Sequence, residues 1–306
     1  MKLAVVGAGA MGGSLAAHAA RAGHDVTIVD VSPAVLEQVN SAGISVRAPE
    51  GEFTAQIAAT DDPTTVGPVD VVVVFVKAQH TEAAAKSLQP LIGTETAVAT
   101  LQNGWGNADR IAAFVPPEQL VVGVTYNSCT STGPGMVVHS GRGRTVLGAY
   151  QGVNQRFAER AAELLSLSGW QTEVSGNVRT EIWKKLVLNA ATLPTAALSR
   201  LNAGALSEPG ELRELVDGLA AETVAVARAQ RLELDLAERV QAIHATLKGA
   251  GSGKASMLQD VLAGRKTEVE TVNGAVVAAG VQHSVAVPLN QAMVALVHGL
   301  ERSYLS

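Results

Sequence analysis

The sequence is poor in cysteine, aromatic residues and charge, and each shortage excludes a class of protein. Its 306 residues include one cysteine, Cys129, so neither an intramolecular disulfide nor a cysteine-based zinc site can form. Seven scattered histidines argue against a dedicated metal site. Charged residues make up 17% and hydrophobic residues 47%, a balance that predicts a well-packed core rather than a disordered chain.

Features that bring proteins to membranes or nucleic acids are also scarce. The net charge of −5 argues against nucleic acid and against an anionic membrane as partners. The longest apolar runs, at residues 69–76 and 274–281, fall short of the roughly 18–20 residues that span a bilayer. The N-terminus loosely imitates a signal peptide, but glycines within residues 7–13 interrupt its apolar part. We therefore expect a soluble, cytoplasmic protein.

The first half of the chain alternates valine-rich runs with segments of helical periodicity. Polar residues 130–135 are expected to form a turn. Alternating strands and helices predict an α/β fold with a Rossmann-type, doubly wound parallel sheet. The expected strands lie near residues 2–6, 25–30, 70–76, 97–101, 120–125, 136–140 and 145–149, and the expected helices near residues 11–22, 33–42 and 81–91.

Beyond about residue 175 the strand-like runs end and apolar residues recur at helical spacing. We therefore expect a dinucleotide-binding domain at residues 1–175 and an all-helical domain at residues 176–306. A flexible loop is expected at residues 249–253. The apolar helices could form either a homodimer interface or a domain core. The expected helices lie near residues 178–199, 211–231, 236–248 and 288–302.

A glycine-rich motif at the first strand-to-helix turn predicts a dinucleotide site. This G-x-G-x-x-G follows an expected strand and opens an expected helix, the context in which the spacing binds a pyrophosphate. The first glycine permits a tight turn, the second leaves room for the phosphates, and the third lets the helix pack close to the strand. The helix N-terminus then presents N–H groups to the phosphates. The cofactor-binding residues expected here are Gly7, Gly9, Ala10, Met11 and Gly12.

Asp30 ends the second expected strand, 18 residues beyond Gly12. A carboxylate there can accept hydrogen bonds from the adenosine ribose hydroxyls and would repel a 2′-phosphate. We therefore expect NAD(H) to be favoured, with NADP(H) remaining an alternative cofactor. Alternatively, Asp30 has only a structural role, as an acid that caps the helix beginning at Ser32-Pro33.

Candidate catalytic residues follow strands or share helix faces. Lys77 and Asn103 each follow an expected strand, at the edge of the sheet where such folds bind ligands, although a solvated lysine and a turn asparagine would look the same. Lys185 and Asn189 lie four residues apart on one face of an apolar helix. Burial there would lower the lysine pKa and make it a better proton donor, whereas Lys184 is expected to be a surface group.

A later segment offers Ser256 and Asp260, which lie on one helix face. Gly264 is expected to end that helix, so its spacing does not bring Glu268 onto the same face. By spacing alone, Glu268 belongs to a solvated charged run at residues 265–270.

Together these segments resemble the ketopantoate reductase family along nearly the whole chain. The resemblance implies an N-terminal Rossmann domain and a C-terminal helical domain. It also implies hydride transfer between a nicotinamide cofactor and C2 of a 2-oxo or 2-hydroxy acid, with the two domains closing on the substrate. The segments that carry it are Gly7–Gly12, Val76-Lys77, Leu101-Gln102-Asn103-Gly104, Trp183-x-Lys185-Leu186-x-x-Asn189, Ser256–Asp260, Arg265-x-Thr267-Glu268 and Asn273-Gly274.

The resemblance assigns roles residue by residue. Lys185 corresponds to the proton donor to the ketone oxygen, and Glu268 to the glutamate that supports it and binds the substrate hydroxyl. Ser256 corresponds to the serine that holds the substrate carboxylate. Further contacts with substrate or cofactor are implied for Asn103, Asn189 and Lys77.

Two positions depart from the family pattern. Leu193 replaces a substrate-contacting asparagine, and Ala203 replaces a later asparagine that precedes a glycine. Both changes remove hydrogen-bonding groups, so the expected substrate is either ketopantoate or a more apolar 2-oxo acid, and oxidation of a 2-hydroxy acid is a further alternative. Alternatives are a β-hydroxyacid dehydrogenase, which also places Lys and Asn four residues apart on a helix, and a non-catalytic NAD(P)-binding redox sensor.

Overall fold

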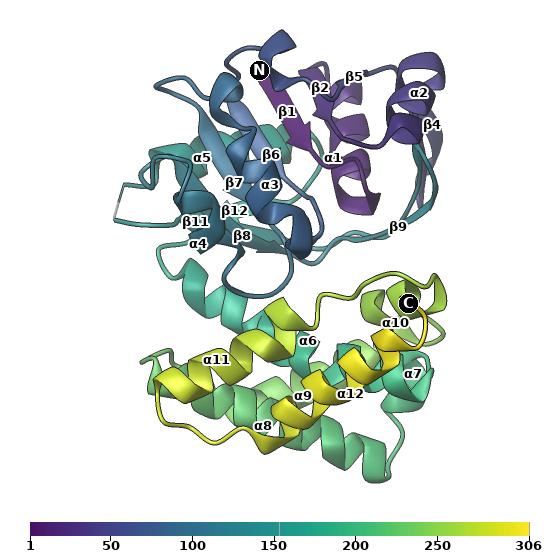
Figure 1. Cartoon of the computed structure of the whole chain (residues 1–306), viewed down its shortest axis with the longest axis vertical. Coiled ribbons are helices and arrows are strands. Elements are labelled where there is room, and N and C mark those ends of the chain that lie inside the picture. Colours follow the sequence, from purple (N-terminus) through teal and green to yellow (C-terminus); the bar gives the residue numbers. More distant parts are fainter. Residues whose placement is uncertain (153, 306) are drawn as a thin grey trace. The chain divides into compact units, whose positions relative to one another are not determined.

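The computed structural model describes residues 1–152 and 154–305, and it divides the chain into two compact units. The first unit is Met1–Gln102 with Asn107–Val178, and the second is Asn103–Gly106 with the chain from Arg179 onward. A short segment of the N-terminal half therefore belongs to the second unit. Figure 1 labels the elements of both units.

Within the described residues, the first unit contains an eight-stranded sheet in the order β12-β11-β8-β7-β6-β1-β2-β5. The strands from β8 to β5 in this order are mutually parallel, whereas β11 is antiparallel to β8 and parallel to β12. The strands are β1 (Lys2–Val6), β2 (Asp25–Val29), β5 (Ala58–Thr60), β6 (Val71–Val74), β7 (Ala97–Thr100), β8 (Leu120–Thr125), β11 (Thr145–Ala149) and β12 (Thr172–Val174).

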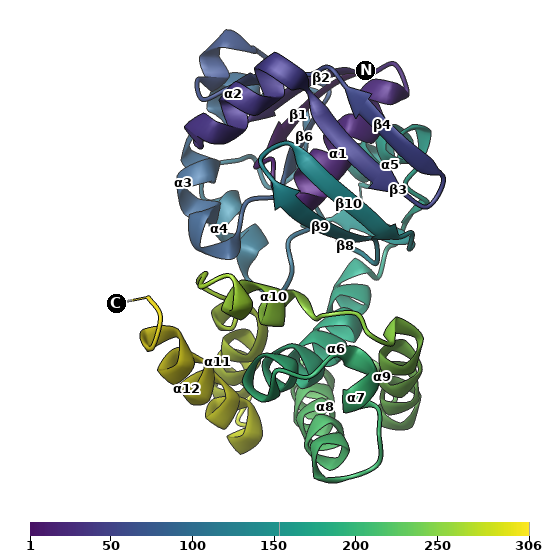
Figure 2. The ribbon, with the colours of Figure 1, turned by 90° about the vertical axis from the view of Figure 1, so that its right-hand side faces the viewer.

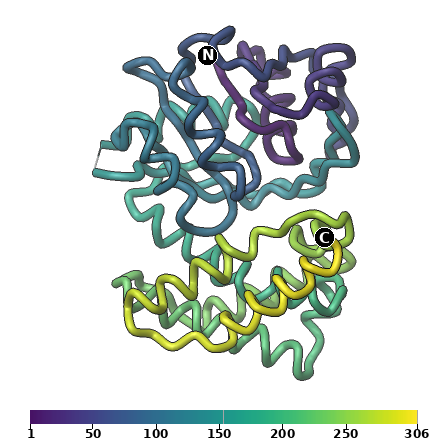
Figure 3. Tube along the Cα trace, viewed as in Figure 1, coloured from purple at the N-terminus to yellow at the C-terminus, as the bar shows by residue number. Residues whose placement is uncertain are grey.

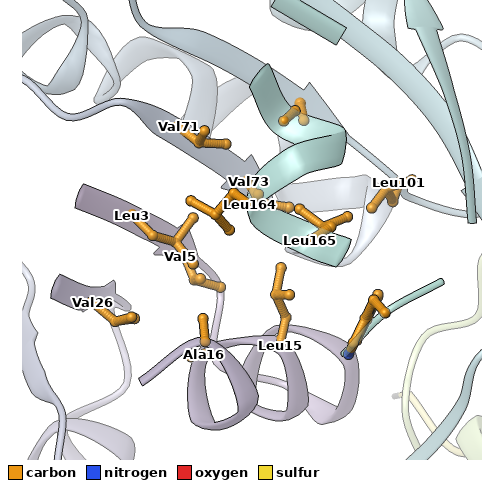
Figure 4. Close-up of a cluster of buried hydrophobic side chains, with 14 of the residues drawn as sticks. Leu3, Val5, Leu15, Ala16, Val26, Val71, Val73, Leu101, Leu164 and Leu165 are labelled. Atoms are coloured by element: carbon orange, nitrogen blue, oxygen red, sulfur yellow. The ribbon is translucent and has the colours of Figure 1, made fainter. Parts of the chain in front are cut away.

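Alternate residues of these strands pack into two separate cores, which confirms the doubly wound arrangement. On one face, side chains of β1 and β6 pack against α1 (Ala10–Arg21) and α5 (Arg156–Leu167), as Figure 4 shows. On the other face, Val72 and Val74 pack with Ile111 of α4 (Asn107–Ala112) and with residues of α3 (Thr81–Lys86). Burial on both faces explains why the strands are continuous apolar runs rather than alternating ones.

A second, four-stranded sheet in the order β4-β3-β10-β9 packs on α1, as seen in Figure 2. The sequence did not predict it, and the expected turn at residues 130–135 is wrong because β9 runs through most of it. This strand is polar and half exposed at the sheet edge, so it lacks the apolar pattern that signals a strand. The strands are β3 (Ile44–Ala48), β4 (Gly51–Ala55), β9 (Ser128–Gly133) and β10 (Met136–Gly141).

Most helix expectations for the first unit are confirmed, since α1 and α2 (Pro33–Ala42) lie where the sequence placed them. The helix expected at residues 81–91 is shorter. It ends at Lys86, and a separate 3₁₀ turn, Gln89–Leu91, follows with Pro90 inside it. A proline fits the first turn of a new helical segment but would interrupt a continuing helix.

The second unit is helical, as the sequence predicted, and Figure 3 follows its chain from teal to yellow. The loop expected at residues 249–253 is shorter than expected because α9 continues to Ala250. Among the described residues, no helix combines the length and hydrophobicity needed to cross a bilayer. The helices are α6 (Val178–Ser199), α7 (Ala203–Leu206), α8 (Glu211–Ala229), α9 (Leu236–Ala250), α10 (Ser256–Leu262), the π-helical turn Glu270–Gly274, α11 (Ala275–Gln282) and α12 (Pro288–Arg302).

Candidate functional site

The glycine-rich turn joins β1 to α1 with a geometry that only glycine can adopt at two of its positions. Gly7 has φ of +95°, and a Cβ there would lie 2.8 Å from the backbone nitrogen of Val76. A Cβ on Gly12 would lie 1.9 Å from the carbonyl oxygen of Gly7. The close packing of helix on strand therefore requires these two glycines.

The same turn leaves an open approach to the start of α1. A Cβ on Gly9 would meet no atom within 4 Å, no side chain caps the helix, and its first turn carries no acidic residue. The first N–H groups of a helix have no partner within the helix and attract anions. The residues present, including Ala10 and Met11, thus fit the pyrophosphate of a dinucleotide.

Asp30 holds this turn from the end of β2. One carboxylate oxygen accepts a hydrogen bond from the Ala8 N–H at 2.7 Å, and the other accepts one from the Ser32 N–H at 2.9 Å. Asp30 therefore links the glycine-rich turn to the start of α2 and is more than a helix-capping acid. Each oxygen keeps a second lone pair, with which it could accept a hydroxyl hydrogen.

Within the first unit, polar side chains also follow β6 and β7. Lys77 follows β6, and its partly buried side chain precedes a short 3₁₀ turn. Gln102 donates hydrogen bonds to the Val76 carbonyl at 2.7 Å and to the Thr81 hydroxyl at 2.8 Å. Gln102, which directly precedes Asn103, thus links the chain after β7 to the chain after β6, a structural role that its place at a strand end could have suggested.

Lys185 is the central ionisable group of the second unit. It lies on α6, and its ammonium donates a hydrogen bond to the Asn103 side-chain oxygen at 2.9 Å. Burial lowers the pKa of Lys185 to about 8, against the opposing effect of the negative charge of Glu268, which raises it. The lowered pKa agrees with the expectation of a desolvated lysine, and Glu268 is close enough to act on it electrostatically although spacing alone placed it in solvent.

The segment that carries Asn103 is held firmly by its neighbours. The Trp105 N–H donates a hydrogen bond to the Thr271 carbonyl at 2.8 Å. Gly104 has φ of +87°, and a Cβ there would lie 2.2 Å from the same carbonyl oxygen. The Trp105 ring packs against Trp183, with centroids 5.9 Å apart, and Arg179 lies over it at 5.3 Å. Asn103 is therefore held in place to receive the lysine.

One turn along α6 from Lys185, Asn189 is 7% exposed, and one turn further Leu193 is 8% exposed. The Thr192 hydroxyl between them donates to the Leu188 carbonyl, so it is already engaged within the helix. Leu193 belongs to the buried apolar cluster of this unit. The face beyond Asn189 is consequently apolar where the family pattern has an amide.

The other departure, Ala203, begins α7, and the candidates Ser256 and Asp260 lie on α10. Ala203 joins the same apolar cluster, and its N–H donates to the Gly253 carbonyl at 3.0 Å. Ser256 opens α10 with an exposed side chain. Asp260, one turn later, is 3% exposed and pairs with the Arg265 Nε at 3.1 Å, which is a structural arrangement.

Comparison with known families covers both units. The model described as "Ketopantoate reductase PanE/ApbA" matches residues 3–152, and "Ketopantoate reductase PanE/ApbA C terminal" matches residues 177–301. A 2-dehydropantoate 2-reductase of Halobacterium salinarum is 33% identical, with 99% of each chain covered. One from Archaeoglobus fulgidus is 31% identical over 98% of each chain.

Solved structures give the same result. The ternary structure of D-mandelate dehydrogenase with NADH and anilino(oxo)acetate has a TM-score of 0.94 and 28% identity, covering 99% of each chain. The 2-dehydropantoate 2-reductase of Geobacter metallireducens has a TM-score of 0.92 and 27% identity, covering 98% of this chain and 99% of that one. The chain thus belongs to the ketopantoate reductase family of nicotinamide-dependent oxidoreductases that act on 2-oxo acids.

Proposed function

We propose that this enzyme uses NADH to reduce a 2-oxo acid with an apolar side chain, and that Lys185 protonates the carbonyl oxygen. The observation that carries the proposal is the Lys185 ammonium, held on Asn103 with a pKa lowered to about 8. A general acid works best when its pKa lies near the working pH. An ordinary surface lysine would retain its proton too strongly.

The chain's own residues manage one proton and the substrate's charge. When bound, the nicotinamide supplies a hydride to the carbonyl carbon, and the carbonyl oxygen then gains negative charge. Lys185 transfers a proton to that oxygen and becomes a neutral amine, which regains a proton from water. The negative charge of Glu268 favours the protonated amine before transfer, and Asn189 and Ser256 hold the substrate by hydrogen bonds.

The preference for NADH rests on Asp30. Its carboxylate, fixed by the N–H groups of Ala8 and Ser32, would accept hydrogen bonds from the ribose hydroxyls and repel a 2′-phosphate. NADH in the D-mandelate dehydrogenase structure supports this choice. Lys77, Asn103 and Glu268 are proposed to complete the cofactor contacts.

The preference for an apolar substrate rests on Leu193 and Ala203, which contribute buried apolar surface. The similar D-mandelate dehydrogenase supports it, because mandelate is a 2-hydroxy acid with a phenyl side chain. A site that lacks a hydrogen-bond partner loses its selectivity for the hydroxyl that ketopantoate carries.

Three features stay predictions: the division of roles between residues 1–175 and 176–306, the cytoplasmic location, and a homodimer formed through the helical domain. Val281 on α11 and Leu296 on α12 are 73% and 55% exposed, which supports pairing through this unit. Sedimentation equilibrium would measure the association.

The cofactor preference predicts that kcat/KM with NADH exceeds the value with NADPH by about tenfold or more, a difference of about 1.4 kcal/mol. Asp30→Asn removes the charge and one of the two acceptors that hold the Ala8 and Ser32 N–H groups, so the preference should weaken in that variant. Steady-state kinetics with both cofactors measure it. A wild-type preference of about tenfold for NADPH would contradict the assignment of Asp30.

The substrate proposal predicts higher kcat/KM for phenylglyoxylate than for ketopantoate in a graded panel of 2-oxo acids. Leu193→Asn should shift the ratio toward ketopantoate by about tenfold or more, because it restores an amide for the hydroxyl. Leu212→Asn on α8 is the matched control and should leave the ratio unchanged. A wild-type enzyme that favours ketopantoate would overturn the choice of an apolar substrate.

Lys185→Ala should lower kcat for reduction by about 10²–10⁴-fold, because the carbonyl oxygen loses its proton donor. Lys184→Ala is the control, since Lys184 neighbours Lys185 in the sequence but pairs with Glu181, at 2.7 Å. It should retain near wild-type kcat. A folded Lys185→Ala variant within about threefold of wild type would exclude Lys185 as the general acid.

The pH dependence should follow the Lys185 proton. Reduction requires the ammonium, so its rate should fall as pH rises through about 8, whereas oxidation requires the neutral amine and should rise over the same range. Glu268→Gln removes a charge that raises the Lys185 pKa. The falling limb of the reduction profile and the rising limb of the oxidation profile should therefore both move to lower pH. Limbs near the ordinary lysine value of 10.5 would contradict the account.

A further inference from the structure

Helix α6 contains a proline beyond its midpoint, and this proline leaves one backbone carbonyl without its usual partner. Pro194 has no N–H, so the carbonyl of Ala190, four residues earlier, cannot receive the usual helical hydrogen bond from position 194. Ala190 is fully buried. A buried carbonyl without a donor is costly, so another group must supply the hydrogen bond.

That group is the side-chain amide of Asn273, in the π-helical turn that follows Glu268. Its Nδ2 donates to the Ala190 carbonyl at 2.9 Å, and Asn273 is 0% exposed. Ala190 directly follows Asn189. The hydrogen bond therefore joins the helix that carries Lys185 and Asn189 to the segment that carries Glu268.

A polar chain behind Asn273 fixes which way its amide faces. Glu222 on α8 accepts a hydrogen bond from Asn290 Nδ2 at 2.8 Å, and a carboxylate can only accept. The Asn290 oxygen must then face Asn273, from which it accepts at 3.0 Å. Asn273 is left to present its NH₂ group, with one hydrogen for Asn290 and the other for Ala190. Glu222 is fixed in turn by the N–H groups of Leu289 and Asn290 at the start of α12.

The same π-helical turn also holds the segment that carries Asn103. The extra residue of a π-helix changes the direction of its carbonyls, and here the Thr271 carbonyl accepts the Trp105 N–H at 2.8 Å. The π-helical turn thus contacts α6 through Asn273 and residues 103–106 through Thr271. Both contact residues lie within five residues of Glu268 in the sequence.

We propose that Asn273 is a positioning residue: by occupying the carbonyl that Pro194 leaves open, it fixes Lys185 and Asn189 in register with Glu268 and Asn103. Asn273 acts through the backbone of α6 and takes no part in the reaction itself. The consequence for catalysis rests on the proposed role of Lys185, whereas the coupling between Asn273 and Pro194 does not.

A double-mutant cycle between Asn273 and Pro194 tests this inference. Asn273→Leu should lower kcat by about 10–100-fold with a smaller change in KM, since small displacements of reacting groups cost rate. The alkaline limb of the reduction profile should also move to lower pH, because Lys185 loses the influence of Glu268. In a Pro194→Ala background the helix supplies its own N–H to Ala190. The same Asn273→Leu change should then cost several-fold less.

Three further variants make the outcome decisive. Thr223→Val removes another buried hydrogen bond, from a hydroxyl to the Leu219 carbonyl on α8, and should keep the wild-type kcat and pH limb. If Asn273→Leu does not fold, Glu222→Gln removes the group that orients the polar chain, and it should shift the limb in the same direction. Lys185→Ala separates the two proposals, because retained activity there would overturn the proposed function alone.

The inference is overturned if Asn273→Leu, or Glu222→Gln in its place, folds and keeps the wild-type kcat and pH limb. It is equally overturned if the effects of the Asn273 and Pro194 changes simply multiply. Urea unfolding midpoints of the four cycle variants give a second readout that is independent of catalysis. Their non-additivity should persist whatever substrate the enzyme uses.

Discussion

The proposed mechanism depends on one physical effect, the removal of the Lys185 ammonium group from water. Burial on α6 disfavours the charged form, and Glu268 opposes that effect, so the pKa settles at about 8 rather than at the ordinary value of 10.5. Asn103 receives one of the ammonium hydrogens at 2.9 Å. The environment of this ammonium thus depends on Lys185, Glu268 and Asn103, which come from separate stretches of the chain.

Two local irregularities of the backbone bring those stretches together. Pro194 leaves the Ala190 carbonyl of α6 without its usual backbone donor. The π-helical turn Glu270–Gly274 changes the directions of its own backbone carbonyls. Asn273 of the π-helical turn donates a hydrogen bond to the Ala190 carbonyl of α6. The Thr271 carbonyl of the same turn accepts one from the Trp105 N–H, next to Asn103 and Gly104. Features that would weaken an isolated helix therefore provide the hydrogen bonds that hold the site.

The sequence predicted those features of the fold and site that depend on residues close together in the chain. Continuous valine runs marked the buried parallel strands, and Gly7 and Gly12 marked the turn at which helix and strand meet closely. The lowered pKa of Lys185 followed from the apolar residues around it on α6. The family resemblance placed Glu268 near this lysine, which spacing alone could not do.

Other parts depend on contacts between distant residues. Strand β3 alternates buried and exposed residues with a period of two that is visible in the sequence, whereas polar β9 is a strand because it pairs with β10. The role of Asn273 needed the position of Ala190, 83 residues away. A proline inside a predicted helix could still have indicated that a carbonyl four residues earlier needs an external donor.

The most direct test is an NMR titration of Lys185 itself, with ¹³C-labelled lysine and Lys185→Arg to assign its ε-carbon signal. The account predicts a titration midpoint at about 8, moving lower in Glu268→Gln. A midpoint at the ordinary 10.5, unchanged by the loss of Glu268, would contradict it.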